Sequence, residues 1–126
     1  MRAADTNVLV RLIVRDDDNQ LASASAFVSN GIWISHLVLA ETIWALDSIY
    51  GLSHSNLVEA LEMLLSQEYV VLEAGDVVSA ALEKFRKSPR PGFSDCLILE
   101  IARKAGHLPL GTFDRNLAKL DDTHKL

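Results

Sequence analysis

The sequence predicts an α/β fold, a three-layer α/β/α sandwich with a mostly parallel central sheet. Short β-rich runs alternate along the chain with longer segments whose apolar residues recur at helical spacing. Strands that alternate with helices typically pair in parallel and are covered by helices on both faces. The 126 residues contain no internal repeat, low-complexity segment or Pro/Gly-rich linker. We therefore expect one domain, residues 1–126, with a single hydrophobic core.

The helices of the N-terminal half are predicted to begin at polar capping residues. The short apolar start is predicted to be a strand, because helical spacing begins only with the run from Val8. Asp5 or Thr6 is the expected cap of the helix that this run forms. Three consecutive aspartates at 16–18 interrupt this run and supply the cap of the second helix. The expected strands are residues 2–5 and 32–35, and the later helices are residues 19–29, 36–50 and 53–66.

The C-terminal half continues the alternation of strand and helix. Residues 69–73 form a β-rich run, and helical spacing resumes at Asp76 until the prolines and glycine of KSPRPG end it. Ser94 is expected to cap the next helix, which ends at Gly106. The run LPLGTF is a final strand-like segment, after which Asp114 opens a short helix. Functional residues are expected at the carboxyl ends of the parallel strands.

The acidic balance of the chain excludes one class of nucleic-acid binder. With 12 Lys and Arg against 17 Asp and Glu, the formal net charge is −5. This charge argues against a protein that holds nucleic acid by broad counterion release. A nuclease remains possible. The carboxylates of its site make the chain acidic, but the divalent cations that they bind allow the site to accept a phosphodiester. The only dense basic run, residues 84–90, is interpreted either as a solvated helix end or as a phosphate contact.

Features of the sequence also bear on membranes and on the cellular compartment. Residues 19–40 carry no Asp, Glu, Lys or Arg, but Asn, Gln, Ser, Gly and His interrupt them too often for a membrane span. Asp5 lies where a signal peptide needs an unbroken apolar run. The single cysteine, Cys96, excludes an intrachain disulfide. We therefore expect a cytoplasmic protein that does not contact a membrane.

Four carboxylates stand out by their positions: Asp5, Glu41, Asp95 and Asp114. Asp5 and Asp114 follow candidate strands, so both are expected at the carboxyl edge of a parallel sheet. Glu41 lies mid-helix on the face that is predicted to pack, where a lone buried carboxylate is costly unless it is paired. Asp95 is expected to point inward from the first turn of its helix.

Each of these acids also has a purely structural interpretation. Asp5, Asp95 and Asp114 each suit a helix cap or first turn, where such an acid contributes roughly 0.5–2 kcal/mol. Glu41 pairs with an arginine in the corresponding structural interpretation. The aspartates at 16–18 are predicted to form a solvated loop and a cap rather than a site. A capping acid can also ligate a metal, so the two interpretations are compatible.

The sequence lacks the residues that other common catalytic and binding sites need. The four histidines show no zinc-like pairing, and a single cysteine does not complete a zinc site. No G-x-S-x-G motif surrounds any serine, and no Walker or dinucleotide-binding glycine pattern follows a predicted strand. The carboxylates are therefore the main candidates for chemistry.

Four segments, taken in order, resemble one known family. They are DTNVLVRLIVRDDDNQLASA, ISHLVLAETIWALDSIYGLS, GFSDCLILEIARKAGH and GTFDRNLAKL. Together they cover nearly the whole chain and closely resemble bacterial PIN-domain proteins of the VapC toxin type. The resemblance implies a PIN-like α/β/α sandwich. It also implies a ribonuclease that hydrolyses RNA phosphodiester bonds as the toxin of a VapBC-type toxin–antitoxin pair.

The resemblance further implies a site and a set of partners. In that family the acids of the matching motifs converge on one pocket and bind Mg²⁺ or Mn²⁺. The catalytic and metal-binding residues implied here are Asp5, Glu41, Asp95 and Asp114. The small polar residues implied to support these ligands are Thr6, Asn7 and Thr112. The implied reaction is cleavage of RNA by metal-activated water, and we expect this hydrolysis to leave a 5′-phosphate. The implied partners are RNA, a cognate VapB-type antitoxin and a second copy of the chain in a homodimer.

Rival interpretations differ in the residues they need. A haloacid-dehalogenase-like phosphatase needs a second Asp where Asn7 stands, and a receiver domain needs a Lys near the end of a late strand, which LPLGT lacks. The stronger rival is a PIN-fold module that binds a protein partner or DNA and has little nuclease activity. Trp33, Trp44 and Tyr50 are candidates for a dimer or antitoxin surface, or for core packing.

Overall fold

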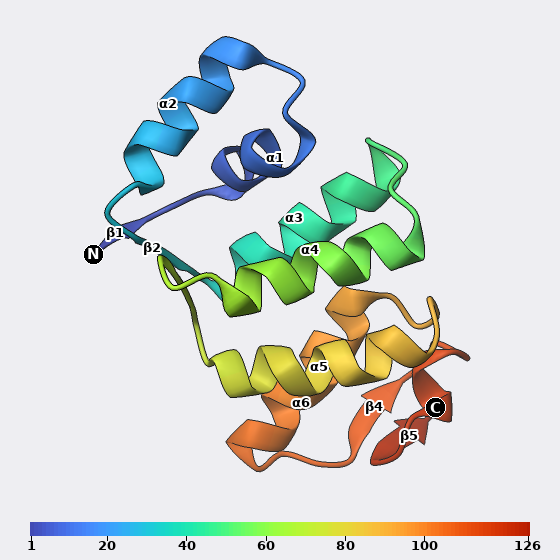
Figure 1. Ribbon diagram of the computed structural model, residues 1–126. Coiled ribbons are helices and arrows are strands. Elements are labelled where there is room, and N and C mark those ends of the chain that lie inside the picture. Colours follow the sequence, from blue (N-terminus) through green and yellow to red (C-terminus); the bar gives the residue numbers. More distant parts are fainter. The chain divides into compact units, whose positions relative to one another are not determined.

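The computed structural model describes residues 1–126 and divides into two compact units, Met1–Gly75 and Asp76–Leu126 (Figure 1). The first unit contains β1 Arg2–Ala3, α1 Thr6–Val14, α2 Asp18–Val28, β2 Ile32–Ile34, α3 His36–Ser48, α4 His54–Ser66 and β3 Val70–Leu72. The second contains α5 Gly75–Lys87, whose first residue closes the first unit, α6 Phe93–Ala105, β4 Leu110–Thr112, the 3₁₀-helix η1 Leu117–Lys119 and β5 Thr123–Lys125. None of these helices has both the length and the apolar character needed to cross a membrane.

The sheet of the first unit has three parallel strands in the order β1-β2-β3. Ile32 of β2 pairs with Arg2 of β1 on one side and with Val70 of β3 on the other. Ile32 and Ile34 are fully buried, whereas Trp33 between them is 38% exposed, because successive side chains of a strand point to opposite faces. The central strand β2 therefore contributes one fully buried face to the core of this unit.

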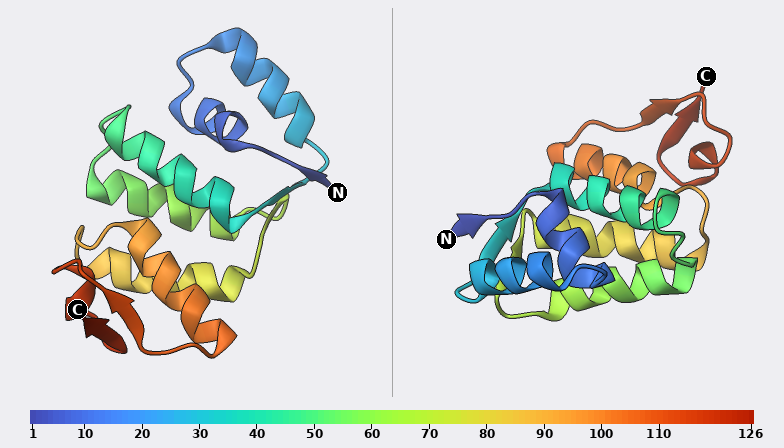
Figure 2. Two further views of the ribbon diagram at one scale, coloured as in Figure 1. Left: turned by 180° about the vertical axis from the view of Figure 1, so that it is seen from behind. Right: turned by 90° about the horizontal axis from the view of Figure 1, so that it is seen from above.

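The helices of the first unit begin largely where the sequence predicts. α1 packs against α2 and α3, and α4 packs against α3 and β3 (Figure 2). Asp5, Asp17 and Ser53 cap α1, α2 and α4, and each side chain accepts a hydrogen bond from a backbone N–H three residues on. The caps expected at Asp5 or Thr6 and within the aspartates at 16–18 are thus found at Asp5 and Asp17, and the helix expected to start at Ser53 does so. Ser35 caps α3 in the same way.

The buried face of α3 differs from the predicted one. The residues that α3 buries are Leu39, Thr42, Ile43, Ala45 and Leu46. Glu41 is exposed, and its neighbours on the same side of the helix, Leu37 and Trp44, are 69% and 61% exposed. The prediction that Glu41 lies on the packed face was wrong, because apolar residues occur on both faces of α3 and their spacing alone does not identify the inward one.

The second unit combines two helices with a small parallel sheet. The buried rings of Phe85 in α5 and Phe93 in α6 contact edge to face, with centroids 5.9 Å apart. β4 and β5 pair in parallel with Gly111 opposite His124, and η1 contacts β5. Every strand pair in the chain is therefore parallel, as predicted, although the strands belong to two sheets.

The second unit differs from the sequence prediction in two places. α6 begins after Gly92, so Ser94 is its second residue and not its cap. The buried Phe93 at the first helical position fixes this start by packing rather than by a hydroxyl. Asp114 opens the short helical segment as predicted, because its Oδ1 accepts from the backbone N of Leu117, the first residue of η1, and its carbonyl accepts from the backbone N of Ala118. The short polar strand β5 was not predicted, because its three residues carry no β-rich apolar pattern.

Candidate functional site

In the first unit, a threonine hydroxyl links the region of Asp5 to Glu41. Asp5 is the N-cap of α1, and its Oδ1 accepts a hydrogen bond from the backbone N of Val8 at 3.3 Å. The next residue, Thr6, donates from Oγ1 to Oε2 of Glu41 in α3 at 3.0 Å. Both carboxylates are exposed. The partner of Glu41 is thus a hydroxyl and not an arginine, and its second oxygen is available to a ligand.

In the second unit, Asp95 and Asp114 form the corresponding pair. Asp95 lies in the first turn of α6 and is partly buried, whereas Asp114 follows β4 and is exposed. The Oδ1 of Asp114 accepts a hydrogen bond from the backbone N of Leu117 at 2.8 Å. The backbone N of Asp114 donates to Oγ1 of Thr112 at 3.0 Å. Thr112 therefore fixes the turn that presents Asp114, while the carboxylate keeps one oxygen without a backbone donor.

The electrostatics of Asp95 are unusual for a surface aspartate. Burial raises the pKa of the Asp95 carboxyl above its ordinary value of 3.8, and the negative charge of Asp114 raises it further. No backbone or side-chain group donates a hydrogen bond to this carboxylate to offset the two effects. Ionisation of Asp95 therefore costs free energy. A cation beside Asp95 and Asp114 would remove this cost.

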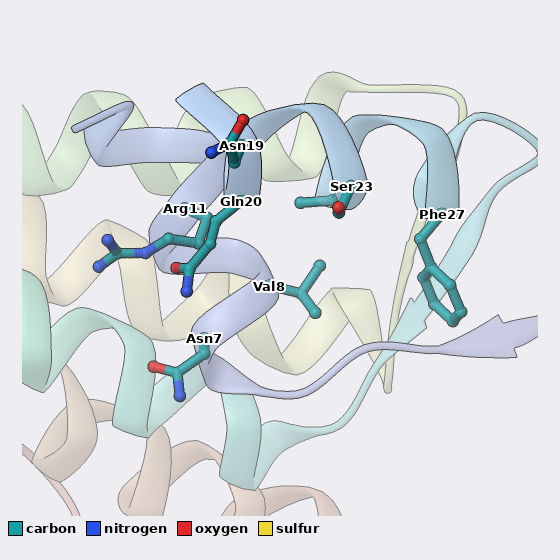
Figure 3. A pocket seen from close by; sticks show the side chains of 8 residues that line it. Asn7, Val8, Arg11, Asn19, Gln20, Ser23 and Phe27 are labelled. Atoms are coloured by element: carbon teal, nitrogen blue, oxygen red, sulfur yellow. The ribbon is translucent and has the colours of Figure 1, made fainter. Parts of the chain in front are cut away.

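Asn7, the third residue of the Asp5-Thr6-Asn7 motif, lines a groove between α1 and α2 (Figure 3). The groove has a volume of about 670 Å³. Its other lining residues are Val8, Arg11, Asn19, Gln20, Ser23, Ala24 and Phe27. Within three consecutive residues the chain thus places a capping acid, a hydroxyl that holds Glu41 and a carboxamide that faces a groove.

One charged cluster was missed by the sequence reasoning. Glu100 of α6 is only 3% exposed and lies 2.7 Å from Lys84 and 2.9 Å from Arg103. Arg103 also contacts Asp122 at 2.6 Å. Burial opposes ionisation of Glu100, but hydrogen bonds from Lys84 and Arg103 outweigh it and lower the pKa of this carboxyl. Lys84, within the basic run at 84–90, is therefore engaged by a buried acid rather than solvated.

The remaining candidates separate into structural and surface residues. Cys96 is fully buried, and burial raises the pKa of its thiol to about 11, so the thiol is unreactive. The hydroxyl of Tyr50 accepts a hydrogen bond from Arg11, whose guanidinium also lies 5.7 Å from the ring centroid. Tyr50 thus has a partner within the unit, whereas Trp33 and Trp44 remain on the surface. Core packing is excluded for Trp44 by its exposure.

The donor chemistry of the two pairs fits a hard divalent cation. No group of three or more His, Cys, Asp or Glu side chains within residues 1–126 is arranged to hold a metal ion. Mg²⁺ does not need such a group, because it keeps several waters and is commonly bound by one or two carboxylates together with substrate phosphate. The pair Asp5 and Glu41 and the pair Asp95 and Asp114 each offer carboxylate oxygens of this kind.

Comparison with known proteins identifies the family. The model of the PIN domain matches residues 3–123, which cover most of both units and include all four acids. The chain belongs to the PIN domain family. PIN domains are generally nucleases that typically use divalent metal ions, and they generally bind RNA. No curated protein and no solved structure matches the chain significantly.

Proposed function

We propose that this PIN domain is a divalent-metal-dependent ribonuclease that hydrolyses RNA phosphodiester bonds, and that it is the toxin of a VapBC-type pair. The proposal is carried by the hydrogen bonding and the ionisation of the acids in this chain of the PIN family. Thr6 holds Glu41 beside the Asp5 cap, and Asp95 lies close enough to Asp114 for its pKa to be raised. A fold that served binding alone would gain nothing from an acid held at this cost.

The proposed ligands are the four acids of the two pairs, with Mg²⁺ or Mn²⁺ as the cation. A divalent cation held by these acids would supply Lewis-acid chemistry, activating water as the nucleophile and neutralising charge on the phosphate and on the leaving oxygen. The chain's own contribution is orientation. Thr6 fixes one oxygen of Glu41, and the backbone N of Leu117 fixes one oxygen of Asp114, so that each carboxylate presents its other oxygen. No side chain is needed as a nucleophile.

The first test is cleavage of a mixed cellular RNA panel by the purified protein, in Mg²⁺ or Mn²⁺ and in EDTA. We expect cutting at discrete sites that requires the metal and is reduced at least about 100-fold in Asp95→Asn. Asp121→Asn is the matched control, because Asp121 is an exposed aspartate of the same unit outside the proposed site. Absence of cutting by the folded protein on every RNA would contradict the proposal and favour a binding module.

The chemistry of the product ends provides a second test. Attack by water is expected to leave 5′-phosphate and 3′-hydroxyl ends on the RNA fragments. Mass spectrometry of the products distinguishes these ends from 2′,3′-cyclic phosphates, which arise when the RNA's own 2′-hydroxyl attacks. Cyclic ends on authentic products would overturn the hydrolytic mechanism even if the cutting required metal.

A partner surface is proposed on the outer face of α3. Leu37 and Trp44 are both more than half exposed and lie on the same side of the helix, on either side of Glu41. Exposed apolar side chains of this size favour contact with a protein, either the cognate antitoxin or a second copy of the chain. We expect Trp44→Ala to remain folded and to lose antitoxin capture or dimer formation. Unchanged capture and unchanged oligomeric state would remove Trp44 from the interface.

A further inference from the structure

The groove between α1 and α2 carries several hydrogen-bonding side chains. Three of its lining residues carry carboxamides: Asn7 at the start of α1, and Asn19 and Gln20 in the first turn of α2. None of these carboxamides has a hydrogen-bond partner within the protein. Figure 3 shows the Gln20 side chain extending from α2 toward Asn7 on α1. The groove therefore offers unused donors and acceptors from both of its walls.

The charge of the groove disfavours phosphate as its occupant. The guanidinium of Arg2 lies over the ring of Phe27, 4.7 Å from its centroid. The one cation of the lining itself, Arg11, contacts Asp16 at 2.7 Å and also donates to the Tyr50 hydroxyl. Its charge is thus paired within the protein. Val8, Ala24 and Phe27 supply apolar surface to the lining of the groove. An uncharged, planar group with a hydrogen-bonding edge suits such a lining better than a phosphate does.

Nucleobases have this combination of a flat apolar ring and a polar edge. Asn and Gln side chains pair with base edges through two hydrogen bonds. Proteins read single-stranded RNA by contacting the edges of bases that are free of a pairing partner. A protein helix in the groove would instead place an apolar face against three carboxamides and leave them without partners, which is unfavourable. The lining therefore favours a base over a polypeptide.

The groove also begins beside the proposed metal ligands of the same unit. Asn7 lies two residues after Asp5, a separation of at most about 7 Å along the chain, and Thr6 between them holds Glu41. A nucleotide whose phosphate is bound near Asp5 and Glu41 thus has its base within reach of Asn7. We propose that the groove between α1 and α2 binds an unpaired nucleobase of the RNA, read by the carboxamides of Asn7, Asn19 and Gln20. This assignment rests on the proposed ribonuclease function and adds a position of base selectivity to it.

Nucleosides test the groove without involving the acids, because they carry no phosphate. The ¹⁵N-labelled protein is titrated with adenosine, cytidine, guanosine and uridine in EDTA, and the side-chain NH₂ signals of Asn7, Asn19 and Gln20 are followed by NMR. At least one nucleoside is expected to shift these signals while that of Asn56, an exposed carboxamide of α4, stays in place. No shift with any of the four nucleosides up to millimolar concentration would overturn the proposal.

Variants sharpen this test. Asn19→Ala and Gln20→Ala are each expected to weaken nucleoside binding about 2- to 10-fold, the loss of one neutral hydrogen bond. Asn56→Ala is the matched control, since Asn56 also lies in the first turn of a helix. Unchanged nucleoside affinity in both groove variants would contradict base binding and favour a polypeptide as the occupant of the groove.

Cleavage assays separate failure of this inference from failure of the ribonuclease proposal. In Mg²⁺, Asn19→Ala and Gln20→Ala are expected to cut the RNA panel with relaxed preference at one nucleotide position. Wild-type cutting with an unchanged site preference in both variants would overturn the groove assignment and leave the nuclease intact. Base-selective NMR shifts without any cutting by the wild type would support the groove and overturn the nuclease.

Discussion

Two acids of α6, five residues apart, show two ways in which this protein treats a carboxylate. Glu100 is buried, yet hydrogen bonds from Lys84 and Arg103 outweigh the cost of burial and lower the pKa of its carboxyl. Asp95 is only partly buried, but burial and then the charge of Asp114 raise the pKa of its carboxyl. A paired acid stabilises the fold, whereas an unpaired acid beside another acid carries a cost that a cation removes. We therefore assign a structural role to Glu100, whereas the functional role of Asp95 is our proposal.

The largest effect is expected from breaking the buried cluster. Glu100→Ala leaves Lys84 without its partner inside the protein and removes one partner of Arg103. The free energy of unfolding should fall by about 3–5 kcal/mol, measured by urea denaturation. Glu83→Ala is the matched control because Glu83 is exposed and pairs only across one helical turn with Arg86. Equal losses in the two variants would contradict a structural role for Glu100.

Acid pH should weaken the same cluster by a smaller amount. Because the folded pKa of Glu100 lies below the ordinary value of 4.5, its contribution to stability is present above that pH. The contribution is lost as the pH falls through the folded pKa. Denaturation of the wild type and of Glu100→Gln between pH 7 and pH 3 checks this sign. Their stabilities should converge toward acid pH, and a gap that widens there would contradict the assignment.

A smaller effect, on activity rather than stability, is expected at Thr6. Thr6→Val removes the hydrogen bond to Glu41 while preserving the shape of the side chain. Loss of such a supporting contact should reduce metal affinity or the cleavage rate about 10- to 100-fold. Thr6→Ser keeps the hydroxyl and is expected to retain most of the activity. A Mn²⁺ titration beside the cleavage assay distinguishes this positioning role from a purely structural one, and wild-type values for Thr6→Val would refute it.

The smallest effect is a gain in stability from removing the unpaired acid. In metal-free buffer at pH 7, Asp95→Asn should be more stable than the wild type, by less than about 1 kcal/mol because Asp95 is only partly buried. The raised pKa means that the cost of Asp95 appears as the pH rises above the ordinary value of 3.8. The two proteins should therefore be equally stable near pH 3. Thermal unfolding at both pH values checks this, and a loss of stability at pH 7 would show that Asp95 is structural.

Local signals predicted much of the first unit. Asp5, Asp17 and Ser53 cap helices because each has a short polar side chain directly before a helical run, and such caps depend on neighbouring residues alone. The parallel strands were likewise predicted from the alternation of β-rich and helical segments. The supporting role of Thr6, in contrast, was implied only by the family resemblance, and the structure shows a hydrogen bond from Thr6 to Glu41.

Tertiary contacts explain what the sequence did not predict. Glu41 was expected to be buried, but α3 turns its other apolar face inward. Phe93 rather than Ser94 sets the start of α6, because an aromatic contact with Phe85 fixes it. The ion pair between Glu100 and Lys84 joins residues 16 positions apart on different helices, and no local sequence pattern predicts it. Each failure depends on a partner that is distant in sequence.

A calorimetric titration with Mn²⁺ tests the proposal that the acids of both pairs bind a divalent metal. The titration compares the wild type with Asp5→Asn from the first unit and Asp95→Asn from the second, and uses Asp121→Asn as the control. We predict that both site variants bind Mn²⁺ at least about 10-fold more weakly than the wild type, with the control unchanged. Wild-type affinity for Mn²⁺ in both site variants would contradict metal binding by these acids.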